Sequence, residues 1–153
     1  MYSAIFQFEQ DFAGSLRCIP MAVRFKLDRC GIKLSLRQWT HLAPEERNRM
    51  LRLPCDRREE IDAYRRELEE LISLRSSKPP EYLAIEVEPL WAESGSVPEQ
   101  VVQFAAQLQV PPPSGSQWAA LSSLQRFTLV KLSRAKHDNV NFLPAMREFG
   151  LLD

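Results

Sequence analysis

Histidine, glycine and long apolar runs are all scarce in this 153-residue sequence, and each shortage excludes a class of site. The two histidines, His41 and His137, lie far apart, and the five glycines form no cluster. A phosphate-binding loop, a nucleophile elbow and a zinc-binding HExxH helix therefore all lack their residues. Acidic pairs such as Glu9 and Asp11 are interpreted as helix starts and solvated faces, not as an acid–base pair. We therefore expect a protein that is not an enzyme and has no catalytic residues.

Membrane-spanning and secretory segments are also missing. No apolar run approaches the roughly 18 residues that a membrane span needs. Residues 1–9 show no basic region followed by a long apolar stretch, so a secretory signal is not expected and the cytoplasm is the default location. Twenty basic and twenty acidic side chains leave no net charge. Because duplex binding needs a sustained cationic surface, we expect no nucleic-acid partner.

Cysteine is limited to three residues, Cys18, Cys30 and Cys55, which are odd in number and widely spaced. This pattern predicts neither a disulfide framework nor a CxxC motif. We interpret the cysteines as reduced, partly buried apolar residues, and we expect no bound metal or cofactor. The alternative is a cofactor carrier or metallochaperone that uses Cys18 and Cys30, since thiolates bind zinc and iron–sulfur clusters.

What the sequence does contain is an internal repeat. The pattern S-x-x-Q-W-x-x-L-x-x-x-x-R occurs twice without a gap, beginning at Ser35 and at Ser114. Each copy predicts a short helix, a break near the leucine, and a longer helix that starts at once. Trp39 and Trp118 are predicted to pack in the core between the short helix and the long one.

The starts of the two longer helices carry different capping signals. Ser122 is followed three residues later by Gln125, which is a capping-box arrangement. In the first copy Ala43 is a poor cap, but Pro44 suits the first helical position and the glutamates that follow it favour the positive end of a helix.

Residues 20–30 can be interpreted in two ways. Apolar and polar residues alternate over residues 23–34 around the turn-like Asp28-Arg29-Cys30-Gly31, which is typical of a β-hairpin. The matching segment of the second copy, residues 98–108, is helical by its period and its alanine content. We therefore predict a helix over residues 20–30 with Gly31 as its C-terminal stop, and the hairpin is the alternative.

The remaining segments complete a mainly α fold. Asp56 and Glu59 predict a long helix that ends near Arg75. Asn141 predicts the cap of a final helix before Gly150. Residues 82–87 could form a short strand against residues 5–8. We predict a single helical domain over residues 1–153, built from two helix–short helix–helix units at about 18–75 and 97–150. The proline-rich connection spans 76–96, and a minor two-stranded β element is compatible with the pattern.

One surface is a candidate for binding a partner. Arginine and methionine are enriched in interface cores, and methionine adapts to imperfect partners. Both occur around the start of the helix predicted over residues 20–30. The predicted partner-binding residues are Arg17, Cys18, Met21, Arg24, Lys26 and Asp28. The alternative is that Met21 belongs to the core while Arg24 and Lys26 are simply solvated.

These residues lie within a sequence that resembles the nitrate reductase-associated protein family of cyanobacteria and some other bacteria. The resemblance covers most of the chain except about residues 76–97. Its motifs are Phe8-Glu9-x-Asp11-Phe12, Leu16-Arg17-Cys18-Ile19-Pro20-Met21-x-Val23-Arg24-x-Lys26-Leu27-Asp28, Gly31-Ile32-Lys33-Leu34, Trp118-x-x-Leu121, Arg126-Phe127-x-Leu129-x-Lys131-Leu132 and Phe142-x-Pro144-Ala145-x-x-Glu148-Phe149-Gly150.

The resemblance implies an accessory or assembly factor, a chaperone-like protein of nitrate assimilation. Its implied partner is the catalytic subunit of an assimilatory nitrate reductase, a cytoplasmic enzyme with a molybdopterin cofactor and an iron–sulfur cluster. The family has no agreed enzymatic activity, so the resemblance implies no catalytic residues. A helix-turn-helix regulator is a third hypothesis, which the neutral net charge disfavours.

Overall fold

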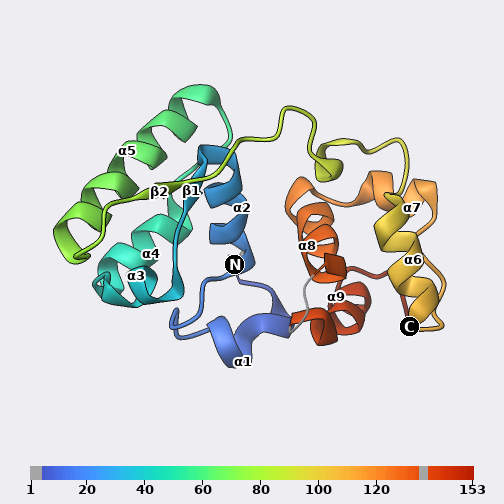
Figure 1. The fold of residues 1–153 in the computed structure, drawn as a ribbon. Coiled ribbons are helices and arrows are strands. Elements are labelled where there is room, and N and C mark those ends of the chain that lie inside the picture. Colours follow the sequence, from blue (N-terminus) through green and yellow to red (C-terminus); the bar gives the residue numbers. More distant parts are fainter. Residues whose placement is uncertain (1–4, 135–137) are drawn as a thin grey trace. The chain divides into compact units, whose positions relative to one another are not determined.

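The computed structural model describes residues 5–134 and 138–153, so His137 lies outside the described residues. Most of the described residues are helical, and a short antiparallel pair of strands is the only sheet found among them (Figure 1). The prediction of a mainly α fold with a minor two-stranded element is confirmed. No helix in the described ranges is long and apolar enough to cross a membrane.

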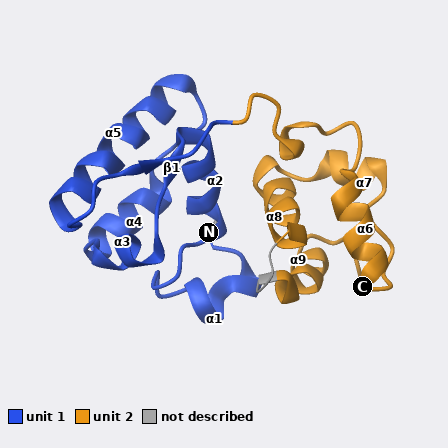
Figure 2. Ribbon diagram, viewed as in Figure 1, with its two compact units in different colours: residues 1–85 blue, residues 86–153 orange. Residues whose placement is uncertain are grey.

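The contacts divide the chain into two compact units, residues 1–85 and 86–153 (Figure 2). The boundary falls inside the proline-rich connection predicted over residues 76–96, and each unit therefore contains one copy of the repeat. The expectation that both copies share a single domain stays a prediction.

Unit 1 places helix α2 against α4 and α5, and α5 also contacts α3 and α4. Its buried interior is aliphatic and aromatic, with Tyr64, Leu68 and Ile72 contributed by α5. The elements of unit 1 are η1 (Gln7–Glu9), α1 (Gln10–Ala13), α2 (Met21–Cys30), β1 (Ile32–Lys33), α3 (Leu36–His41), α4 (Pro44–Arg52), α5 (Arg58–Arg75) and β2 (Glu81–Tyr82).

Helix α2 confirms the helical interpretation of residues 20–30 and excludes the hairpin. It ends because Gly31 adopts a left-handed conformation, with φ of 76°, and its N–H donates to the carbonyl of Leu27. Glycine is the residue that most readily accepts this conformation at a helix end. A Cβ at this position would also lie only 3.0 Å from the side chain of Ile85.

The predicted pairing of residues 82–87 with residues 5–8 is wrong. Strand β2 pairs antiparallel with β1 instead, with Ile32 opposite Tyr82 and Lys33 opposite Glu81. Residues 7–9 are unavailable to a strand because they form the turn η1. The carboxylate of Glu9 accepts the N–H of Phe6 at 3.1 Å, which stabilises that turn.

Helix α5 begins two residues after Asp56, so the predicted cap is shifted by one position. The capping carboxylate is that of Glu60, which accepts the N–H of Arg57 at 2.8 Å. The predicted end at Arg75 is confirmed. In the last helix, α9, Asn141 occupies the predicted N-cap position, but its side chain makes no cap hydrogen bond.

Unit 2 is built around α8, which contacts η2, α6, η3 and α9. Its central position explains why α8 buries Phe127, Leu129 and Leu132 on several sides. The elements of unit 2 are η2 (Leu90–Ala92), α6 (Glu99–Gln107), α7 (Gly115–Ala120), α8 (Ser123–Arg134), η3 (Asp138–Asn141) and α9 (Phe142–Glu148).

The repeat produces the same local structure in both units. Ser35 caps α3 and Ser114 caps α7, each in a reciprocal capping box with the glutamine three residues later. Both short helices then end at a leucine in an extended conformation, with ψ of 148° at Leu42 and 152° at Leu121. The next helix starts immediately, and the capping box predicted between Ser122 and Gln125 forms. At the start of α4 the side chain of Ala43 makes no cap bond, as predicted, but its N–H donates to the carboxylate of Glu46 at 2.7 Å, a contact that was not predicted. The repeat prediction of a short helix, a break and a longer helix is confirmed.

Candidate partner-binding surface

Each repeat tryptophan anchors an upstream segment of its own unit. Trp39 and Trp118 are both fully buried. The indole Nε1 of Trp39 donates to the carbonyl of Leu16 at 2.8 Å, and that of Trp118 donates to the carbonyl of Glu93 at 2.9 Å. A buried indole needs such an acceptor, so the predicted core role of the tryptophans includes a polar contact with a distant backbone segment.

In unit 1 the anchored segment is the loop that precedes α2, residues 14–20. Leu16 has a φ of 61°, which is strained for a residue with a side chain, and its carbonyl is the acceptor for Trp39. Three residues later the carbonyl of Ile19 accepts the Nε of Arg24 at 3.2 Å. The loop is therefore fixed on both sides of Arg17 and Cys18.

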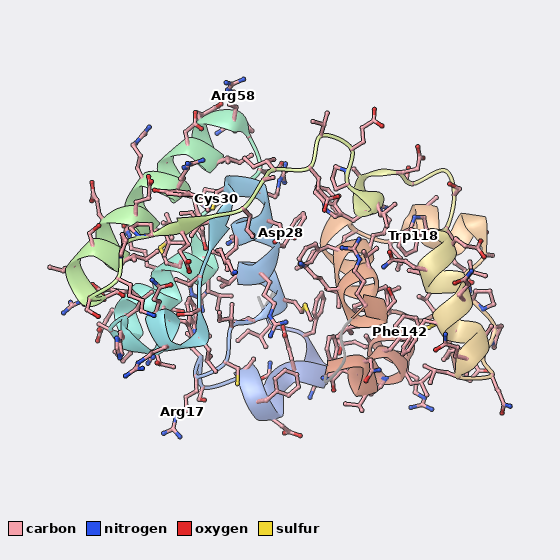
Figure 3. The ribbon with its side chains drawn as sticks, in the orientation of Figure 1. Arg17, Asp28, Cys30, Arg58, Trp118 and Phe142 are labelled. Carbon is pink, nitrogen blue, oxygen red and sulfur yellow. The ribbon has the colours of Figure 1, made fainter. Side chains whose placement is uncertain are left out.

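Arg17 and Cys18 are presented by this fixed loop. The Arg17 side chain is exposed, and Figure 3 shows it extending outwards from the loop. Cys18 is half-buried. A side chain on a preorganised backbone loses less conformational entropy when a partner binds it, so this loop is the best-formed contact surface among the predicted site residues.

The other predicted residues do not form one face with the loop. Met21 is buried, in agreement with the alternative that it belongs to the core. Arg24 and Asp28 are four residues apart and share one side of α2, where both are half-buried. Lys26 lies about half a turn away from them, so the predicted residues on α2 do not share one side of the helix, while Arg17 and Cys18 lie on the loop before it.

The side chain of Lys26 makes its polar contacts within unit 1. Its Nζ donates to the carbonyls of Leu51 and Leu53, each at 2.6 Å, and lies 5.8 Å from the ring centre of Tyr64. Burial lowers the pKa of this amine. Lysine near the C-terminus of a helix satisfies carbonyls that have no helical partner, and Lys26 does this for α4.

Glu9 supports the loop from the other side. Its side chain is buried, and its carboxylate accepts the N–H of Met21 at 3.1 Å in addition to that of Phe6. An anion at the first N–H groups of a helix is stabilised by the helix dipole. The interpretation of Glu9 as part of a solvated face is therefore wrong, because the carboxylate joins the N-terminal turn to α2.

The three thiols are free and do not form a common site. Cys18 precedes α2 and Cys30 ends it, so about 15 Å of helix separates them, whereas two ligands of one zinc ion lie within about 4 Å. Burial raises the pKa of the Cys30 thiol to about 11 and that of Cys55 to about 12. Within residues 5–134 and 138–153, no group of three or more His, Cys, Asp or Glu side chains is placed to hold a metal ion. A site shared by Cys18 and Cys30 does not fit this geometry.

The motif arginines differ between the units. Arg126 is buried, and its guanidinium donates to the carbonyls of Trp91, Trp118 and Leu121. Arg47, at the same position of the first copy, donates through Nη1 to the carbonyl of Thr40 at 3.3 Å, while its Nε is buried without a partner among the described residues.

Sequence reasoning missed Phe12 as a surface residue. Its ring is 39% exposed on α1, immediately before the fixed loop. No spacing pattern in the sequence indicates this exposure, because Phe12 belongs to a four-residue helix that is too short to form an apolar stripe. Aromatic residues and arginine are both enriched in interface cores.

Comparison with known proteins agrees with the resemblance noted in the sequence. The family model described as "Conserved nitrate reductase-associated protein" matches residues 5–149, which is nearly the whole chain. The searches of curated proteins and of solved structures found no match to this chain. The chain belongs to the family of conserved nitrate reductase-associated proteins.

Proposed function

We propose that this protein is a non-enzymatic accessory factor that binds a molybdenum-dependent assimilatory nitrate reductase in the cytoplasm and supports its maturation or activity. The observation that carries the proposal is the loop of residues 14–20, which is fixed by Trp39 and Arg24 and presents Arg17 to solvent. The family description supplies the association with nitrate reductase.

A binding role needs no chemistry on this chain. A partner that binds only the folded or half-assembled reductase stabilises that state by mass action. The gain is about 2.7 kcal/mol when the partner is present at one hundred times its dissociation constant. Arg17, Cys18 and Phe12 are the contact residues we propose, with Arg24 and Asp28 on the adjoining side of α2 and Met21 and Lys26 as internal supports.

The test is co-purification of tagged variants with the reductase from cells growing on nitrate. Arg17→Glu reverses a charge on an exposed side chain and should abolish co-purification without loss of helical content. Arg58→Glu makes the same charge change at the exposed start of α5 and is the matched control (Figure 3). Normal binding by Arg17→Glu would show that the proposed surface is not the contact.

A second comparison addresses the stage at which the protein acts. Cofactor-loaded and cofactor-free reductase are each offered to the wild-type protein. A maturation factor should retain the cofactor-free form preferentially, whereas a subunit of the mature complex should retain the loaded form.

A further inference from the structure

The segment that includes β2 has one paired edge and one open edge. The N–H of Leu83 donates to the carbonyl of Gly31 at 2.8 Å, so the backbone of Leu83 faces β1. Successive residues of a strand direct their N–H and C=O groups to opposite edges. The backbone groups of Tyr82 and Ala84 therefore point away from β1, towards the open edge.

Within unit 1, no described segment forms hydrogen bonds along this open edge. From residue 84 to residue 88, no backbone N–H or carbonyl forms a hydrogen bond with another described residue. The side chains are apolar yet exposed, at 50% for Tyr82 and 53% for Ile85. Proteins normally protect such an edge with lysine, proline or a covering segment, because it can pair with another chain. Here the nearest prolines, Pro80 and Pro89, lie outside the segment. β2 itself spans two residues and the chain bends at residues 87 and 88, so the open edge is confined to residues 81–86.

The edge is held in place by α5. The hydroxyl of Tyr82 donates to the carboxylate of Glu69. The guanidinium of Arg65 lies 4.8 Å from the Tyr82 ring centre and donates to the carbonyl of Cys30 at 3.3 Å. Because the strand is already ordered, an added strand would not have to order it, which favours association.

The charge of this segment indicates which kind of peptide would bind to it. Its charged side chains are Glu81, Glu86 and Glu88, and the chain has no lysine or arginine from residue 79 to residue 125. Opposite charges across a strand pair are favourable and like charges are unfavourable. We propose that an extended segment of a partner protein, apolar at its centre and flanked by lysine or arginine, adds to this edge as an antiparallel strand. This mode of recognition combines backbone hydrogen bonds with side-chain selection.

The experiment uses the full chain and two synthetic peptides. One has the sequence Lys-Lys-Val-Thr-Val-Thr-Lys-Lys, and the other has glutamate in place of every lysine. We expect the lysine peptide to bind at least tenfold more tightly by calorimetry and to slow deuterium exchange of the Ala84 amide. Equal affinity for the two peptides, or no protection of Ala84, would overturn the proposal.

Two sets of variants test the backbone hydrogen bond and the charge of the segment separately. Ala84→Pro removes the outward N–H and should abolish binding, while Ala84→Ser keeps that N–H and is the matched control. Glu86→Lys leaves the backbone intact and should weaken the lysine peptide at least threefold, which keeps the proposal testable if the proline variant misfolds. Unchanged affinity in Glu86→Lys, or in a folded Ala84→Pro, contradicts strand addition by a basic segment. Arg17→Glu should bind the peptide normally, so this result is independent of the reductase contact.

Discussion

Each unit has what we call a tryptophan corner: the buried repeat tryptophan, the motif arginine and the upstream segment that the tryptophan anchors. The two corners share a sequence pattern, but their buried polar groups do not find hydrogen-bond partners equally well. In unit 2, Arg126 reaches three backbone carbonyls and Trp118 reaches a fourth. In unit 1, Arg47 keeps a buried Nε without a partner among the described residues, and the acceptor of Trp39 belongs to the strained residue Leu16.

This difference indicates a division of roles between the corners. Strain persists only where the surrounding structure determines it, and it concentrates at functional sites. In unit 1 the strained, anchored loop presents Arg17, whereas the anchored segment of unit 2 contains Glu93, Ser94 and Gly95 and no basic residue. The corner of unit 2 serves stability, and we infer that the corner of unit 1 gives up some stability to display a surface.

The largest expected difference between the units appears in alkali, because all three cysteines belong to unit 1. The folded-state pKa values of Cys30 and Cys55, about 11 and 12, lie above the ordinary value of 9.0. The stability that these thiols contribute is present below pH 9 and is lost as the pH rises towards 12. Burial raises the pKa of Tyr64 in the same direction, whereas the lowered pKa of Lys26 opposes the loss.

The indole NMR signals of Trp39 and Trp118 report the two units separately. We expect the native Trp39 signal to disappear at a lower pH than that of Trp118. Replacing Cys30 and Cys55 with alanine together should narrow the gap between the two midpoints. Simultaneous loss of both signals, with no effect of the cysteine changes, would contradict a separate alkaline transition of unit 1.

The next largest effect concerns the motif arginines. Arg126→Met removes the donor from the carbonyls of Trp91 and Leu121, the two acceptors at 2.8 Å or less. At about 1 to 3 kcal/mol for each of these acceptors, the change should lower the free energy of unfolding by about 2 to 6 kcal/mol. Arg47→Met loses one bond and removes an unpaired buried Nε, so it should cost less than about 1 kcal/mol. Urea unfolding measures both values. Equal losses of unfolding free energy in the two variants would mean that the two arginines contribute equally to stability.

The smallest expected difference in stability between the two units, but the most informative result for function, comes from Trp39→Phe and Trp118→Phe. Each change removes one indole donor and should cost about 1 to 3 kcal/mol. Only Trp39→Phe releases Leu16 and the loop that presents Arg17. We therefore expect weaker co-purification with the reductase for Trp39→Phe and unchanged co-purification for Trp118→Phe, at similar losses of stability. Equal binding by both variants argues against the anchored loop.

The sequence predicted the local structure of the repeat well, because capping boxes are local signals. Serine, glutamine and the leucine break lie within eight residues of each other in both copies, and the serine and glutamine form a reciprocal capping box in each. The helix over residues 20–30 was predicted only by comparing the copies, since its own alternating pattern favours a hairpin.

The contacts between distant segments could not be predicted from spacing. Glu9 contacts Met21, Lys26 contacts the end of α4, and β1 pairs with β2 across almost fifty residues. In each case the sequence gives no sign of the contact, because the hydrogen-bond partner is a backbone group that only the fold brings close. The division of the predicted binding residues between two sides of α2 has the same cause.

The absence of basic residues between 79 and 125 also determines how the two units can be cut apart. Trypsin cleaves after lysine and arginine and is blocked by a following proline, as at Lys78, so after Arg75 at the end of α5 its next site follows Arg126. A protease specific for glutamate has exposed targets there, Glu86 among them. Digestion with that enzyme is therefore the direct route to separated halves, whereas tryptic resistance of the intact chain would say nothing about rigidity between them.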